Sequence, residues 1–163
     1  MMVAVCGPNE ATTDEMQLAE AVGEALARAG CTVITGGRDG VMAAACRGAK
    51  RAGGVTIGVL PSYDRKDANP WVDHVICTGM GEARNTIIVA SAEAIIAIGG
   101  GLGTLSEIAL ALKLGKQVIV LASWELDGEW LGRHGAAPRY CRADSVDEAV
   151  TLALARSTGE HRR

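Results

Sequence analysis

The alternation of short apolar runs with amphipathic segments constrains the fold of this chain more than any other feature. Apolar runs at 3–6, 31–35, 55–60, 74–78, 94–98 and 117–121 have the length and composition of strands that are buried on both faces. Segments with apolar residues at helical spacing lie between them at 12–29, 41–52, 82–92 and 104–114, and another follows at 145–154. With a short last strand at 139–141, this order predicts an α/β fold: a single-domain doubly wound, Rossmann-like parallel sheet of six or seven strands flanked by helices.

Length and composition fit one domain. The chain has 163 residues, of which 48% are apolar, so a single core can offset the entropy lost on folding. We expect the domain to span 1–156 and the polar tail at 157–163 to be frayed. The 21 glycines and the absence of Phe indicate a core of small aliphatic side chains connected by glycine-rich loops.

Charge, cysteine content and hydropathy argue against several classes of protein. A net charge of −3 and a pI near 5.6 give no basic surface for nucleic acid. Five scattered cysteines do not indicate a disulfide framework and favour a reducing cytoplasm. No export or membrane segment is predicted, because the longest apolar stretch, at 87–98, contains Ser91 and Glu93. No metal site is predicted either, since a strand would send His74 and Cys77 to opposite faces.

Three glycine-containing loops follow predicted strands, at 7–9, 36–40 and 99–104. Ligands of a doubly wound sheet bind beyond the carboxyl ends of the strands, so these loops are expected to converge on one rim. We therefore predict that a ligand lies against Gly7, Gly36, Gly37 and Gly40. The longer polar loop at 61–73 is predicted to be either a lid over that ligand or a plain crossover.

The loop at 99–104 is the most specific element, because four of its first five residues are glycines and a threonine follows. It leads into a helix whose first amides have no partner within the helix, and such an end binds anions. We predict that a phosphate ester lies against Gly100, Gly101, Leu102, Gly103 and Thr104. The alternative is a tight turn whose glycines serve packing alone. No Gly-Lys-Ser/Thr follows, which argues against triphosphate hydrolysis, and the spacing differs from the dinucleotide fingerprint.

Two charged residues are candidates for chemistry at the same rim. Glu107 comes three residues after Thr104, in the first turn of the predicted helix, where it is a candidate acid or base. Arg84 and Asn85 lie at the start of the helix after the fourth strand, where a cation opposes the helix dipole. This mismatch favours a ligand or a buried carboxylate, Glu107 or Glu82, as the partner of Arg84. The alternatives are a glutamate that only stabilises its helix and a solvated surface arginine.

The segments at 86–92 and 105–114 are apolar on nearly every side. A helix of this kind is buried on two faces, and one of these covers the sheet. The other face is predicted to meet a second copy of the chain around a two-fold axis, which gives a homodimer or a tetramer.

A set of motifs occurs together in this chain: Thr35-Gly36-Gly37 with Gly40-Val41-Met42, Gly53-Gly54 ahead of Gly58 and Pro61, Arg84, and Gly100-Gly101-x-Gly103-Thr104-x-x-Glu107. Over about 2–122 the chain resembles the LONELY GUY family, long mislabelled as lysine decarboxylases. The resemblance implies a phosphoribohydrolase that cleaves the N-ribosidic bond of a nucleoside 5′-monophosphate. It also implies that Glu107 and Arg84 are catalytic, without a cofactor.

The chain departs from that family at two places. The Pro-Gly-Gly of the family is Gly99-Gly100-Gly101 here, and its Met-His-x-Arg-Lys is Gly81-Glu82-Ala83-Arg84-Asn85. The latter form resembles a shorter sister group that includes molybdenum cofactor carrier proteins, which bind a phosphorylated pterin without transforming it. Two functions therefore stay open: hydrolysis of a nucleoside 5′-monophosphate, and carriage or sensing of a phosphorylated pterin or nucleotide. A purely structural domain would not explain the glycine loops together with Arg84 and Glu107.

Overall fold

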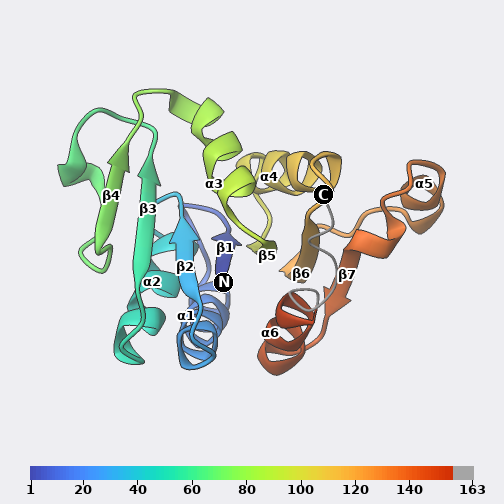
Figure 1. The fold of residues 1–163 in the computed structure, drawn as a ribbon, viewed down its shortest axis with the longest axis horizontal. Coiled ribbons are helices and arrows are strands. Elements are labelled where there is room, and N and C mark those ends of the chain that lie inside the picture. Colours follow the sequence, from blue (N-terminus) through green and yellow to red (C-terminus); the bar gives the residue numbers. More distant parts are fainter. Residues whose placement is uncertain (156–163) are drawn as a thin grey trace.

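The structure is a computed structural model that describes residues 1–155, so the predicted frayed tail lies outside the described residues. The strands are β1 (Met2–Cys6), β2 (Thr32–Thr35), β3 (Thr56–Leu60), β4 (His74–Cys77), β5 (Ala94–Gly99), β6 (Gln117–Ser123) and β7 (Tyr140–Ala143). They form one seven-stranded sheet in the order β4-β3-β2-β1-β5-β6-β7, and all neighbours run parallel (Figure 1). The predicted doubly wound sheet is confirmed.

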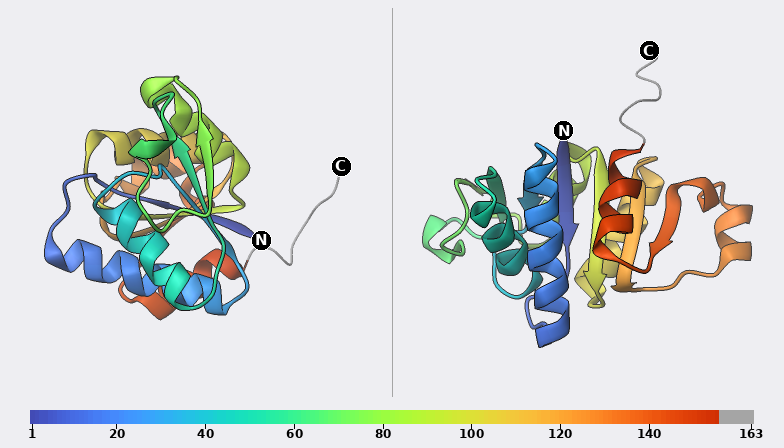
Figure 2. Two further views of the ribbon diagram at one scale, coloured as in Figure 1. Left: turned by 90° about the vertical axis from the view of Figure 1, so that its left-hand side faces the viewer. Right: turned by 90° about the horizontal axis from the view of Figure 1, so that it is seen from below.

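Helices cover both faces of this sheet (Figures 1 and 2). One face packs against α1 (Thr13–Arg28), α2 (Val41–Arg51) and α6 (Val146–Leu154), and the other against α3 (Asn85–Ser91), α4 (Leu102–Lys113) and α5 (Gly128–Arg133). Side chains alternate along the strands, so Val3 and Val5 belong to the first core whereas Ala4 and Cys6 belong to the second. The Cys6 thiol therefore faces the same side as α3 and α4.

The ends of several elements differ from the sequence predictions. The helix predicted from Thr104 begins at Leu102, because Gly101 is extended (φ −106°, ψ 168°) and caps it. Glu107 therefore lies in the second turn of α4 rather than the first. The helix predicted from Glu82 begins at Asn85, after a 3₁₀ turn at Gly81–Arg84, and the last strand runs from Tyr140 to Ala143 instead of 139–141.

The two predicted capping boxes have different outcomes. The box of Thr12 and Glu15 at the start of α1 is confirmed, with both hydrogen bonds present. At the start of α6, Ser145 accepts from the Glu148 amide as predicted, but the Glu148 carboxylate accepts from the amide of Asp144.

The position of β5 beside β1 in the sheet determines where a ligand can bind. From β1 the chain proceeds outward through β2 and β3 to β4, then returns to pair β5 with the other side of β1. The winding direction reverses between β1 and β5, and at such a switch point the loops after the two strands leave a crevice between them. The loops at 7–9 and 100–101 follow these two strands.

Helices α1 and α2 pack closely through glycines, which makes a stability prediction possible. A Cβ on Gly48 would overlap the backbone oxygen of Glu20. We expect Gly48→Ala to lower the free energy of unfolding by about 1–3 kcal/mol, because the two helices must move apart. Gly132 in α5 has no neighbour within 4 Å of such a Cβ, so Gly132→Ala is a control of the same chemistry without the overlap. Urea denaturation of both variants measures the difference, and equal stabilities would contradict the packing argument.

Candidate functional site

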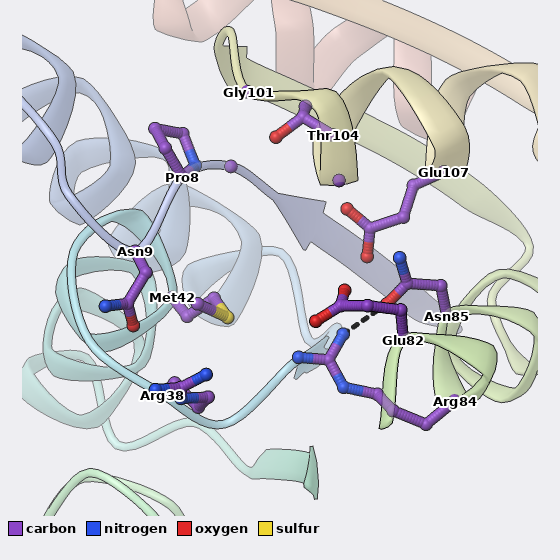
Figure 3. A pocket seen from close by; sticks show the side chains of 12 residues that line it. Pro8, Asn9, Arg38, Met42, Glu82, Arg84, Asn85, Gly101, Thr104 and Glu107 are labelled. Atoms are coloured by element: carbon purple, nitrogen blue, oxygen red, sulfur yellow. Dashed lines mark hydrogen bonds between the residues drawn. The ribbon is translucent and has the colours of Figure 1, made fainter. Parts of the chain in front are cut away.

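A pocket of about 240 Å³ opens at the carboxyl ends of the strands, beside the switch point (Figure 3). Loops after β1, β2 and β5 contribute to it, together with the 3₁₀ turn at Gly81–Arg84, the beginnings of α2 and α3 and the first turns of α4. Its lining consists of Gly7, Pro8, Asn9, Arg38, Met42, Glu82, Arg84, Asn85, Gly101, Gly103, Thr104 and Glu107. The expected convergence of the three glycine loops on one rim is confirmed.

The first turn of α4 forms one wall of the pocket. The amides of Leu102, Gly103 and Thr104 precede the first backbone bond of the helix, in which the Leu105 amide donates to the Gly101 oxygen at 3.0 Å. Gly103 and Thr104 line the pocket, whereas the Leu102 side chain is 79% exposed. An open helix N-terminus at the wall of a pocket is suited to bind an anion.

Glu107 lies one turn further along the same face of α4 and points into the pocket (Figure 3). Only 6% of the residue is exposed. Burial raises the pKa of its carboxyl to about 7, although the Arg84 guanidinium and a hydrogen bond with the Cys6 thiol act in the opposite direction. Near neutral pH, Glu107 therefore populates both protonation states, as a general acid or base requires.

Arg84 is a buried cation without a direct carboxylate partner in the described part of the chain. It is 6% exposed, its Nη1 donates to Asn85 Oδ1, and its buried Nε has no hydrogen-bond partner among residues 1–155. No carboxylate oxygen among these residues lies within the 4.0 Å of an ion pair with it. Burial lowers the pKa of its guanidinium, while Glu107 and Glu82 act electrostatically to raise it. Arg84 thus interacts with these two carboxylates electrostatically across the pocket, and the described residues contain no direct ion pair between them.

Asn85 connects the 3₁₀ turn that carries Arg84 with α4, which carries Glu107. Its Oδ1 accepts from Arg84, and its Nδ2 donates to Ser106 Oγ of α4 at 3.2 Å. Ser106 in turn donates to the carbonyl oxygen of Gly103 at 2.6 Å. This chain of hydrogen bonds orients the guanidinium relative to the first turn of α4.

The structure places the residues predicted from the sequence in two groups. Gly7, Arg84, Asn85, Gly101, Gly103, Thr104 and Glu107 line the pocket, whereas Gly36, Gly37, Gly40, Gly100 and Leu102 do not. Two glycines of the second group nevertheless shape it: a Cβ on Gly36 would lie 2.6 Å from Arg84 Nη2, and one on Gly40 would overlap the Asn9 oxygen. Their absent side chains let Arg84 and the loop after β1 approach the loop after β2. Direct ligand contacts of all twelve residues stay predictions.

Five residues of the lining were not among the predicted site residues, and one of them, Glu82, had been considered only as a partner of Arg84. Pro8, Asn9 and Arg38 lie in the loops already identified from their glycines, and their positions next to those glycines are a signal that could have included them. Met42, in the first turn of α2, belongs to the Gly40-Val41-Met42 motif of the family resemblance, and that motif is the signal that could have included it.

The long loop at 61–73 contains a short 3₁₀ turn, Arg65–Asp67, and is tied to the loop after β2. The buried Asn69 donates its backbone amide to the Gly37 oxygen at 2.8 Å and its side-chain amide to the Arg38 oxygen at 2.9 Å. These bonds favour the crossover interpretation for the second half of the loop over the lid.

Residues 1–155 contain neither a candidate membrane span nor a metal-ligand cluster. No helix there has the length and apolar character needed to span a membrane. No group of three or more His, Cys, Asp or Glu side chains there is arranged to hold a metal ion.

Comparisons with known proteins identify the family. Residues 1–150 match the model of the SLOG cluster4 family. The chain is 31% identical over 155 residues to a cytokinin riboside 5′-monophosphate phosphoribohydrolase of Mycobacterium marinum, with 83% of each chain covered. The molybdenum cofactor binding protein of Rippkaea orientalis is 41% identical with a TM-score of 0.86, over 94% of this chain and 95% of that chain. The molybdenum cofactor carrier protein of Chlamydomonas reinhardtii is 34% identical, also with a TM-score of 0.86, over 97% and 98%. The resemblance seen in the sequence is thus confirmed, and the chain belongs to the SLOG cluster4 family, within a LONELY GUY-like group that includes molybdenum cofactor carriers.

Proposed function

We propose that the pocket binds a phosphorylated small molecule, with the phosphate at the N-terminus of α4. The observation that carries this proposal is the buried Arg84, which has no ion-pair partner among residues 1–155 and lines the same pocket as Gly103 and Thr104. An unpaired buried charge is costly, and a phosphate supplies both the missing charge and acceptors for the guanidinium and the helix amides.

We further propose that the ligand is a phosphorylated pterin of the molybdenum cofactor type, held as cargo. The two cofactor-binding relatives support this choice, since they are 41% and 34% identical over nearly the whole chain. The test is purification of the protein from a host that makes this cofactor, followed by elemental analysis for molybdenum and pterin fluorescence after oxidation. We expect both signals in proportion to the protein. Protein without pterin, and without affinity for added cofactor, would overturn the choice of ligand.

A second function, hydrolysis of the N-ribosidic bond of a nucleoside 5′-monophosphate, is favoured by the pKa of Glu107 near 7. In this reaction Glu107 would activate water or orient the ribose hydroxyls, and Arg84 would stabilise charge on the departing base through an oxocarbenium-like transition state. Arg84 itself cannot donate the proton, because its guanidinium stays protonated. Release of base from a panel of monophosphates, lost in Glu107→Gln, would establish the hydrolase. If folded protein that still binds phosphate releases no base, the carrier function remains.

The charge of Glu107 should make anion binding depend on pH. Sulfate is a suitable probe because it does not titrate between pH 6 and 8.5. We expect its affinity to fall roughly three- to tenfold over this range, since ionisation of Glu107, with its pKa of about 7, adds a negative charge to the pocket. Calorimetric titration at several pH values measures the effect, with Glu107→Gln as the control. The same slope in both proteins would contradict the assignment.

We also propose that the chain assembles with itself through the outer face of α4. Leu102 is 79% and Trp130 45% exposed, and an apolar groove of about 590 Å³ runs between α4 and α5. Large exposed apolar surfaces of this kind favour association. Light scattering distinguishes a monomer from the predicted dimer or tetramer.

A cytoplasmic location and the absence of a nucleic-acid partner stay predictions from composition.

A further inference from the structure

The end of β6 carries an irregularity next to the candidate anion site. Ile98 of β5 pairs with Leu121, but Gly99 pairs with Ser123, so Ala122 is an extra residue on β6. Ala122 has a φ of +50°, and among residues 1–155 no other non-glycine residue has a positive φ. A bulge of this kind bends the strand and redirects the side chains that follow.

The two residues after the bulge both reach the turn at 99–101. Ser123 Oγ donates to the carbonyl oxygen of Gly99, and Trp124 Nε1 donates to that of Gly101 at 3.1 Å. Ser123 is the last residue of β6 and Trp124 follows it, so both side chains reach this turn from the end of the strand. The two hydrogen bonds lie on either side of Gly100, and Gly101 is the residue that caps α4.

Trp124 is itself held in place by β7. The hydroxyl of Tyr140 donates to the Trp124 oxygen at 2.5 Å and accepts from the Leu126 amide at 3.1 Å. The indole nitrogen also lies 3.4 Å from the position that a Cβ on Gly100 would occupy. A chain of contacts thus runs from β7 through the half-buried indole to the cap of α4.

We propose that Trp124 is a positioning residue, which fixes the turn at 99–101 so that the amides of α4 face the incoming anion. The inference rests on the anion site of the proposed function. Donors that are already fixed lose little freedom when a ligand arrives, so they bind it more tightly than donors of a mobile turn. Loss of one such hydrogen bond should weaken binding about three- to tenfold.

Sulfate titration of Trp124→Phe, which keeps an aromatic ring but has no N–H, tests the proposal. The matched control is Trp71→Phe, because Trp71 lies against Arg47 of α2 and its carbonyl oxygen accepts from Thr56 at the start of β3, away from the turn. We expect a three- to tenfold weaker affinity for Trp124→Phe and wild-type affinity for the control. Equal affinities of wild type and Trp124→Phe would overturn the positioning role. Absence of sulfate binding by the wild type would instead overturn the anion site.

A second measurement decides the question if Trp124→Phe folds poorly. The wild-type chain has three tryptophans, whose indole N–H groups give separate nuclear magnetic resonance signals. Sulfate should shift the signal of Trp124, which donates to the cap of α4, and leave those of Trp71 and Trp130 unchanged. Binding with a stationary Trp124 signal would contradict the proposal.

Discussion

Glu107→Gln is expected to stabilise the protein by about 3 kcal/mol at pH 8 and by much less at pH 4. In the unfolded chain this carboxyl ionises near pH 4.5, whereas in the folded pocket burial holds its proton up to about pH 7. The folded state therefore binds more protons between these values, so stability falls as pH rises through this window and stays low above it. A pKa raised by this amount corresponds to about 3 kcal/mol, and glutamine, which never ionises, avoids the loss.

Urea denaturation at pH 4, 6 and 8 measures this difference. Glu82→Gln is the matched control, because Glu82 lines the same pocket but is exposed to solvent. We expect the stability of the control to follow that of the wild type at each pH. If wild type and Glu107→Gln lose stability in parallel, Glu107 is not the buried titrating group that the site requires.

Arg84→Met is expected to weaken the binding of sulfate or phosphate about 10- to 100-fold without loss of stability. A hydrogen bond from a charged donor contributes about 1.5–3 kcal/mol, which corresponds to this change in affinity. The folded protein without ligand should lose nothing, because it no longer buries a guanidinium whose Nε has no partner among the described residues. Unchanged stability together with lower affinity is the signature of a charge kept for binding.

Calorimetric titration and thermal unfolding of the same samples give both quantities. Arg38→Met is the control, since Arg38 lines the pocket but its side chain is exposed, so a smaller loss of affinity is expected. If Arg84→Met unfolds at a lower temperature than the wild type and has the same affinity for sulfate, Arg84 stabilises the fold and does not bind the ligand.

The central strands could be predicted because parallel strands buried on both faces must be continuously apolar, as 94–98 is. The edge strand β4 was also predicted, but it is largely exposed and not buried on both faces as its apolar run suggested. The short helix α5 was missed because two of its six residues are glycines, and only the cap from Asp127 to the Trp130 amide favours it. The start of α4 was placed two residues late for the same reason, since Gly103 is a poor helix former and Leu102 precedes it.

The meeting of Glu107 and Arg84 in one pocket could be predicted, because the topology brings the ends of β1 and β5 together and both residues follow glycine-rich segments. The distance between their charged groups could not, since it depends on how Asn85 holds the guanidinium against α4. The contact of Trp124 with Gly101 could not be predicted either, because Trp124 follows the bulge at Ala122, and a bulge has no clear signature in a single sequence.

The central claim is that the first turn of α4 binds the phosphate of a small ligand. The most direct test is a titration of ¹⁵N-labelled protein with inorganic phosphate, followed through the backbone amide signals. We predict saturable shifts of the amides of Gly101, Leu102, Gly103 and Thr104, while those of α6 on the opposite face of the sheet stay unchanged. Stationary signals at the start of α4, or saturable shifts confined to another part of the chain, would contradict the account.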